Sequence, residues 1–204
     1  MGLISMRNII NFLFLIIPYK NLLLRRIYCV KKQKYFIRLD MRGSGDVKKT
    51  NAARILDKNK IKYTLLEYEV DEGDLSAENV AAKVEVPLEE IFKTLVARGD
   101  KTGIIVACVP GGEELNLKAL ASISGNKKVE MVPLKEILQL TGYIRGGVSP
   151  IGMKKSYPTY FHKSIENFPK ILISAGVRGC QIALNPSDLI KIVNGKIGEL
   201  TVES

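Results

Sequence analysis

IFKTLVARGDKTGIIVACVP, residues 91–110, is the stretch that decides the fold. Two runs rich in apolar and β-branched residues, 91–98 and 103–110, flank four residues, 99–102, that begin with a glycine. A connection of this length and composition favours a β-hairpin. The second run is apolar on both faces of the predicted strand, which is typical of a strand in the interior of a sheet. The sequence therefore predicts a fold built around this hairpin.

Short helical and short extended patterns alternate on both sides of the hairpin. Helices are expected at about 50–59, 76–82, 116–122, 133–140 and 186–193. Extended segments are expected at 62–70, 127–132, 159–162, 170–174, 180–185 and 196–202. Such a mixture predicts a single compact α+β domain, with a central mixed, mostly antiparallel sheet and short helices packed around it. We assign this domain to residues 41–204.

The amino-acid composition limits the cellular compartment and the kinds of chemical site that the chain can form. The chain has 204 residues, 46% of them hydrophobic, which is enough to bury a core. Its three cysteines are widely spaced, which fits neither a disulfide framework nor a zinc site and favours a reducing, cytoplasmic compartment. The single histidine, His162, excludes a multi-histidine metal site and is expected at a strand end with no special role. We expect no metal and no cofactor.

Residues 1–40 differ in kind from the rest of the chain. They carry 8 of the 31 basic residues and 1 of the 21 acidic ones, so most of the net charge of +10 belongs to this segment. Its apolar run 9–17 ends at Pro18 and is too short to span a bilayer. Three interpretations remain open: a targeting segment, a membrane-surface anchor, or sequence upstream of a working start at Met41, which we favour. Membrane contact is expected only if residues 1–40 act as an anchor.

The sequence GGVSPIG at residues 146–152 forms neither a regular helix nor a regular strand. Its glycines permit positive φ angles or a close approach to the main chain, and Pro150 stiffens the segment. The loop is either a tight connection between two strands or a cradle for a polar or anionic group. Three cations flank it, which favours an anionic ligand: Arg145, Lys154 and Lys155.

Lys93 is the charged residue in an otherwise apolar strand, residues 91–96. Both faces of that strand are apolar, so we expect the lysine to be partly buried beside the core. Burying an ammonium without a partner is costly. Lys93 is therefore either a lysine that extends its ammonium to solvent from a strand end, or a cation directed into a pocket that holds an anionic or carbonyl-bearing ligand.

Three motifs occur in a fixed order: Phe92-Lys93-Thr94-Leu95, the segment 142–152 and the segment 174–179. Together with the closing segment 184–190 they resemble the YbaK/EbsC family of aminoacyl-tRNA deacylases, typified by the Cys-tRNA(Pro) deacylase. This family is similar to the editing domain of bacterial prolyl-tRNA synthetases. The resemblance covers about residues 48–204. It implies an α+β fold with a central, largely antiparallel sheet of six or seven strands.

The resemblance also implies roles for individual residues. Lys93 matches the functional lysine of the family and is the candidate catalytic residue. The candidate substrate-binding residues come from the glycine-rich loop, the turn after it and one strand: Tyr68, Gly146, Gly147, Ser149, Pro150, Gly152, Ser174, Gly176 and Arg178. The candidate tRNA-binding residues are the cations beside the loop: Arg145, Lys154 and Lys155.

The implied reaction is the deacylation of mischarged tRNA, above all of Cys-tRNA(Pro), by a trans-editing hydrolase. The sequence offers no obvious Cys–His or Ser–His pair. The resemblance therefore implies that the thiol of the substrate, or a water assisted by a tRNA hydroxyl, is the nucleophile. Two alternatives stay open: a deacylase for another small amino acid, such as Ala-tRNA(Pro), and a non-catalytic module that binds tRNA ends. A prolyl-tRNA synthetase is a further candidate partner.

Overall fold

The computed structural model describes residues 49–202, all within one compact unit. The interpretations given above for residues 1–40 lie outside the described residues. Within the described part of the chain, no helix is long and apolar enough to cross a membrane. The α+β class predicted from the sequence is confirmed, because strands and short helices alternate along this single unit.

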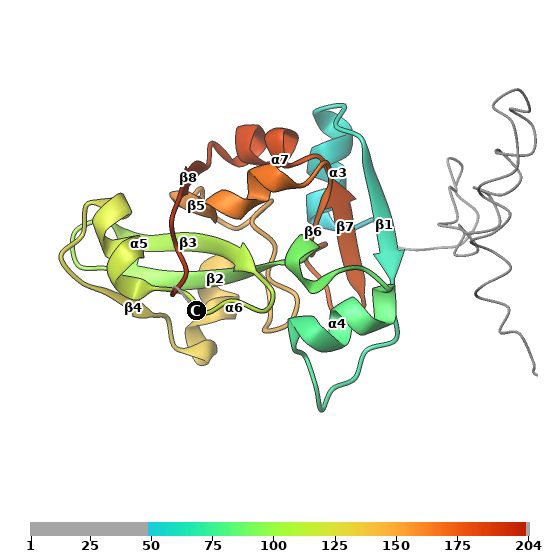
Figure 1. Cartoon of the computed structure of the whole chain (residues 1–204), viewed down its shortest axis with the longest axis horizontal. Helices are drawn as coiled ribbons and strands as arrows, with labels where there is room; N and C mark the ends of the chain where they lie inside the picture. The colour runs from blue at the N-terminus through green and yellow to red at the C-terminus, as the bar shows by residue number, and fades with distance from the viewer. Residues whose placement is uncertain (1–48, 203–204) are drawn as a thin grey trace, which may run out of the picture. The chain divides into compact units, whose positions relative to one another are not determined.

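The predicted hairpin is the centre of a five-stranded sheet (Figure 1). Strand β2 (Phe92–Gly99) pairs antiparallel with β3 (Gly103–Pro110) along its whole length. The strand order is β4-β2-β3-β5-β8, with β4 at Val129–Met131, β5 at Thr159–His162 and β8 at Lys196–Gly198. Strand β3 is buried from Ile105 onward, so it is the interior strand that its apolar sequence predicted.

A second sheet has three antiparallel strands in the order β1-β7-β6. Its strands are β1 (Tyr63–Glu67), β6 (Ile171–Ser174) and β7 (Cys180–Leu184). A single parallel bridge, between Ile91 and Leu172, joins this sheet to the first. The sequence led us to expect one central sheet, whereas the structure divides the strands between two. The reason is that β4 pairs only with residues 97–99 of β2, whereas β6 is joined to the five-stranded sheet only by the bridge at Ile91, just before β2.

Short helices flank both sheets, and their ends follow the capping residues in the sequence. Ser76 begins α4 (Ala77–Val84) by accepting a hydrogen bond from the N–H of Asn79. Gly142 ends α6 (Leu134–Thr141) with a φ of +84°, a conformation that favours glycine. The other helices are α3 (Asn51–Lys58), η1 (Leu88–Glu90), α5 (Leu117–Ser124), η2 (Lys163–Asn167) and α7 (Pro186–Val193). Figure 1 shows α5 and α6 beside the five-stranded sheet and α3 and α4 beside the three-stranded one.

One hydrophobic cluster binds the two sheets into a single domain. It combines Phe161 of the five-stranded sheet with Ile173 and Ile182 of the three-stranded sheet, all fully buried. Leu56 of α3 and Leu189 of α7 belong to the same cluster. Because both sheets contribute to one core, neither is expected to be stable without the other.

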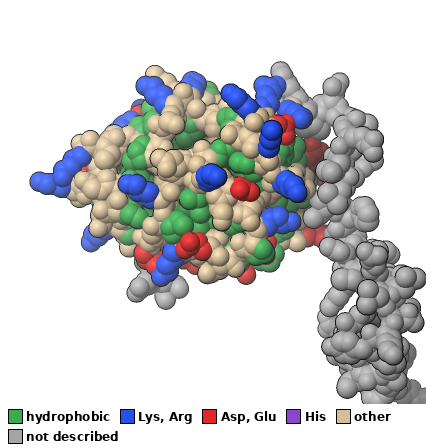
Figure 2. All heavy atoms as spheres, turned by 90° about the horizontal axis from the view of Figure 1, so that it is seen from above, with side chains coloured by type: hydrophobic (Ala, Val, Ile, Leu, Met, Phe, Trp, Pro, Cys, Tyr) green, Lys and Arg blue, Asp and Glu red, His purple; other side chains and the backbone are tan. Residues whose placement is uncertain are grey.

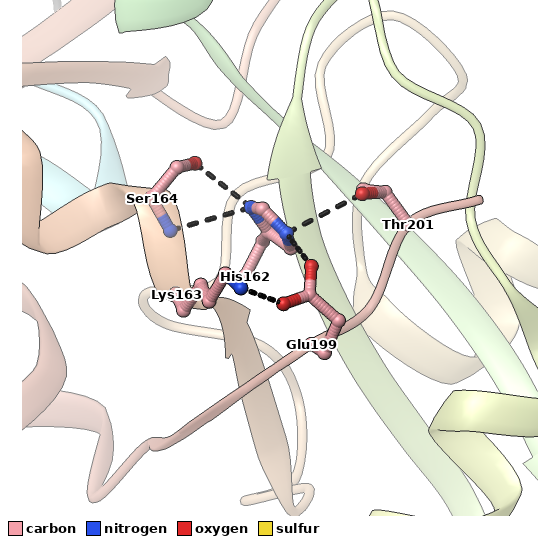
Figure 3. Close-up of polar contacts among 5 residues, drawn as sticks. All are labelled: His162, Lys163, Ser164, Glu199 and Thr201. Carbon is pink, nitrogen blue, oxygen red and sulfur yellow. Dashed lines mark hydrogen bonds and ion pairs between the residues drawn. The ribbon is translucent and has the colours of Figure 1, made fainter. Parts of the chain in front are cut away.

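His162 is the last residue of β5, the strand end expected from the sequence, and it joins three segments (Figure 3). Its Nδ1 accepts a hydrogen bond from the backbone N–H of Ser164, which places the proton of the neutral ring on Nε2. Nε2 lies 2.7 Å from a carboxylate oxygen of Glu199 and 3.3 Å from the hydroxyl of Thr201. The histidine therefore has a structural role, because it fastens the C-terminal segment to β5.

Candidate active site

A pocket of about 400 Å³ opens beside the first half of β2. In this half, one edge of β2 is paired with β3. Among the described residues, the opposite edge belongs to no ladder between residues 97–99, which pair with β4, and the bridge from Ile91 to β6. The pocket lining comes from β2, from the start of α4, from the entry to α6, from the glycine-rich loop and from the second sheet. Its residues include Leu75, Ser76, Glu78, Phe92, Lys93, Thr94, Leu95, Met131, Leu134, Arg145, Gly146, Val148, Ser174 and Gln181.

Lys93 lines this pocket and is half-buried, as its apolar surroundings predicted. Its Nζ donates a hydrogen bond of 2.9 Å to the carbonyl of Gly111, which follows β3. That carbonyl is fixed in turn, because the N–H of Gly111 donates to the carbonyl of Ile91 at 2.7 Å. An ammonium has three donors, so the contact holds the group in place and leaves two donors for a ligand.

Backbone groups of β2 also reach the pocket. The carbonyl of Val96 accepts a hydrogen bond from the N–H of Val132, on the edge that faces away from β3. Backbone groups two residues apart point to the same edge of a strand, so the N–H and carbonyl of Thr94 face this edge too. The β4 ladder does not extend to Thr94. The pocket therefore has a backbone donor next to Lys93.

The first half of the glycine-rich loop lies against the pocket. Gly146 and Val148 line it, and Gly146 has a φ of +81° that favours glycine. Gly147 is not among the lining residues. A side chain at that position would come within 3.2 Å of the backbone of Val177 and Arg178, so Gly147 allows the loop to pack against the turn after β6.

The second half of the loop is turned into the protein. Ser149 is fully buried, and its Oγ accepts a hydrogen bond from the N–H of Ile151. Pro150 is buried, and the carbonyl of Gly152 accepts a hydrogen bond of 2.8 Å from Asn51 of α3. None of these residues lines the pocket, so their contacts anchor the loop to α3 and the core.

The turn after β6 contributes one residue to the pocket lining and one residue that holds the turn against the glycine-rich loop. Ser174 lines the pocket, and its Oγ accepts a hydrogen bond from the N–H of Gly176, which packs against Tyr143. Arg178 lies outside the lining. Its Nε donates to the carbonyl of Arg145 at 2.9 Å, and its guanidinium pairs with Glu72 at 2.5 Å. Arg178 thus ties the turn to the glycine-rich loop.

Tyr68 and two of the flanking cations also lie outside the pocket lining. Tyr68 packs against the cluster around Val80, and its N–H donates to the carbonyl of Gly179 at 2.9 Å. Lys154 is exposed and donates to the carbonyl of Gln139 at 3.3 Å, and Lys155 is exposed beside it. Arg145 is exposed and lines the pocket. The roles assigned to these residues from the sequence stay predictions.

Sequence reasoning missed Gln181, which lines the pocket from β7 and is 5% exposed. Within residues 49–202, every side-chain nitrogen or oxygen that is fully enclosed has a hydrogen-bond partner. The Gln181 side-chain amide has no partner among these residues, so it is not fully enclosed. The amide is therefore open to the pocket. The available signal was the one that singled out Lys93, a polar residue inside an apolar strand.

The cysteines of the described residues are poor nucleophiles. Burial raises the pKa of the Cys108 thiol to about 12 and that of Cys180 to about 11. Both thiols therefore stay protonated near neutral pH. Neither cysteine lines the pocket, and His162 does not line it either. Cys108 and Cys180 are buried in the core, where they serve packing.

The fold and the pocket define a small α+β protein with a pocket between its two sheets and an anchored ammonium, that of Lys93, in the pocket wall. Residues 71–192 match the aminoacyl-tRNA editing domain family. The chain is 49% identical, over 76% of its length and 94% of the relative's, to an Enterococcus faecalis protein whose name describes it as a candidate Cys-tRNA(Pro)/Cys-tRNA(Cys) deacylase, EbsC. The chain belongs to the aminoacyl-tRNA editing domain family, which confirms the resemblance found in the sequence.

Two further comparisons extend this result. The chain is 36% identical to the proline–tRNA ligase of Thermosipho africanus, over 39% of its own length and 14% of the ligase. A crystal structure described as a candidate trans-editing enzyme for prolyl-tRNA synthetase superposes with a TM-score of 0.66 at 22% identity, covering 75% of this chain and 96% of the other. At that identity the superposition establishes the fold.

Proposed function

We propose that the chain is a trans-acting deacylase of mischarged tRNA and that Cys-tRNA(Pro) is its preferred substrate. The observation that carries this proposal is the position of Lys93, whose ammonium is anchored by the Gly111 carbonyl at the wall of the pocket. A volume of about 400 Å³ is near the lower end for ligand pockets, which suits a small aminoacyl ester. The name of the E. faecalis relative supports the choice of substrate.

The first task of such a site is to stabilise the negative charge that develops on the ester carbonyl. Oriented donors in a site shielded from water do this most effectively, because they need no reorganisation during the reaction. In our proposal the carbonyl oxygen receives hydrogen bonds from the Nζ of Lys93 and from the backbone N–H of Thr94. The two groups come from adjacent residues of a strand that β3 holds in place, which supports a fixed geometry.

The second task is to hold the amino acid. Its α-ammonium needs acceptors, and the Oε1 of Gln181 and the Oγ of Ser174 are the neutral oxygens that β6 and β7 offer to the pocket. We assign the α-ammonium to this pair. The apolar lining residues, among them Phe92 and Leu95, then surround the amino-acid side chain. A pocket of about 400 Å³ with this lining favours small side chains.

The third task is to supply a nucleophile, and we assign it to the substrate. The raised pKa values of both described cysteine thiols and their position outside the pocket argue against a thiolate from the protein. With Cys-tRNA, the substrate sulfur attacks its own ester carbon. A carbon–sulfur bond forms, the bond to the ribose oxygen breaks, and the thiol proton passes to that oxygen. The resulting thiolactone is then hydrolysed by water.

The decisive experiment measures turnover with purified protein and a panel of aminoacylated tRNAs. We expect many moles of tRNA(Pro) to be released per mole of enzyme from Cys-tRNA(Pro), and much slower release from cognate Pro-tRNA(Pro). Preferential turnover of Ala-tRNA(Pro) would identify the alternative deacylase. Saturable binding without any turnover would identify a non-catalytic module that binds tRNA ends, and would refute the proposal.

A further inference from the structure

Two exposed apolar side chains lie at the mouth of the pocket, and a third continues the surface that they form. Met131, Leu134 and Leu138 are 45%, 62% and 53% exposed. Met131 and Leu134 also line the pocket, so they form part of its rim. Leu138 follows Leu134 by one helical turn of α6 and therefore continues the same surface.

This surface is a face of α6 that the core does not use. Ile137 and Thr141 are the buried residues of the helix and pack on its inner side. On the outer side a helix normally carries polar residues, whereas here two leucines stand four positions apart. Single exposed apolar residues are common, but three that adjoin a pocket indicate a binding surface. We call Met131, Leu134 and Leu138 the rim patch.

We propose that the rim patch binds the face of the 3′-terminal adenine of the substrate, an inference that rests on the proposed function. If the aminoacyl group occupies the pocket, the ribose attached to it lies at the mouth and its base extends onto the rim. An unstacked base presents a flat apolar face that proteins bind with apolar, aromatic or guanidinium groups. Arg145 lines the same pocket and is exposed, so a guanidinium is also available to the terminal nucleotide.

The charge around the rim patch favours a nucleotide over an apolar protein segment. Lys135 is exposed between the two leucines, and Arg145 follows the helix after four residues. Glu136, on the same helix, is neutralised by a 2.6 Å ion pair with Arg98. Glu78 also lines the pocket, but it comes from α4 and not from α6. An apolar surface with two cations beside it matches the apolar face and the phosphate of a nucleotide together.

The test uses an acceptor-stem minihelix that carries no amino acid and has 2-aminopurine in place of the 3′-terminal adenine. The fluorescence of this base changes when its stacking changes, so it reports the environment of the base directly. We expect the full-length protein to change this fluorescence on binding. Leu134→Asp and Leu138→Asp should abolish the change and weaken binding by roughly tenfold. Val202→Asp, at a position that is 50% exposed and does not line the pocket, should behave as wild type.

A second measurement separates this inference from the proposed function. Hydrolysis of cysteine ethyl ester needs the pocket but no base, so Leu138→Asp, at a position of the rim patch that does not line the pocket, should retain it while its KM for Cys-tRNA(Pro) rises by about tenfold. An unchanged KM and an unchanged fluorescence signal in Leu138→Asp would overturn the inference and indicate a protein partner for the patch. Failure of the wild type on both substrates would instead refute the proposed function.

Discussion

Replacement of Lys93 by alanine tests the central element of the proposed site. The side chain makes one hydrogen bond, from Nζ to the carbonyl of Gly111, and its strand is paired with β3 along its whole length. Alanine therefore removes the ammonium without altering the ladder that defines the pocket wall. We expect a large loss of catalysis and a small loss of stability.

The magnitudes follow from the contacts. Removing one donor that stabilises an oxyanion costs about 10²–10³ in kcat, or about 3–4 kcal/mol. The lost hydrogen bond to Gly111 contributes about 1 kcal/mol to stability. For a domain of this size, that change lowers Tm by about 2–4 °C. The effect on rate is therefore well separated from the effect on folding.

The assay is single-turnover deacylation of labelled Cys-tRNA(Pro) with enzyme in excess, so that product release does not limit the rate. Lys170→Ala, which removes an exposed lysine outside the pocket, is the matched control and should keep the wild-type rate. Lys93→Arg should fall between wild type and Lys93→Ala, since it keeps the charge but changes its geometry. If folded Lys93→Ala deacylates within about threefold of wild type, far less than the loss expected for an oxyanion donor, the proposed role of Lys93 is wrong.

Three further predictions concern other parts of the chain. Cys108→Ser and Cys180→Ser should deacylate at nearly the wild-type rate; a loss of several hundredfold, with the fold intact, would point to a protein thiol as the nucleophile. The affinity for a minihelix should fall as the salt concentration rises. Alanine substitution of Arg145, Lys154 or Lys155 should reduce the slope of log K against log[salt] by about one unit for each phosphate contact removed. A slope that none of the three substitutions changes would exclude the cations beside the loop as phosphate contacts. The pKa of Glu199 is lowered by its contacts with Lys163 and His162, so its carboxylate stabilises the fold above the unfolded pKa and loses this effect as pH falls through the folded pKa. Glu199→Gln should thus lower Tm more at pH 7 than at pH 3; equal shifts at both values would contradict this.

Local sequence signals predicted the elements that depend on near neighbours. The hairpin of residues 91–110, the start of the helix expected at residue 76 and the end of the helix expected at residue 140 each rest on the physics of a few adjacent residues. Lys93 could also be found, because burial of one charge in an apolar strand is costly wherever the strand lies. These features did not require knowledge of the tertiary arrangement.

Features that depend on distant segments could not be predicted in this way. The division into two sheets results from where β4 and β6 meet the β2 segment, which involves residues 30 to 81 positions away in the sequence. The loop at residues 146–152 looked uniform in sequence, yet its first half faces the pocket while Ser149 is buried in the interior. Glycine and proline reveal an unusual backbone but not which side of it meets a ligand.

The asymmetry of β2 explains how one strand serves both stability and chemistry. On one edge, pairing with β3 and the contact between Lys93 and Gly111 restrict the motion of the ammonium. On the other edge, the ladder stops before Thr94, so a backbone donor stays available beside that ammonium. A site that acts by positioning needs rigid donors more than it needs a reactive side chain. The interruption between the two sheets is therefore the structural feature that creates the proposed active site, because a continuous ladder along β2 would close the pocket.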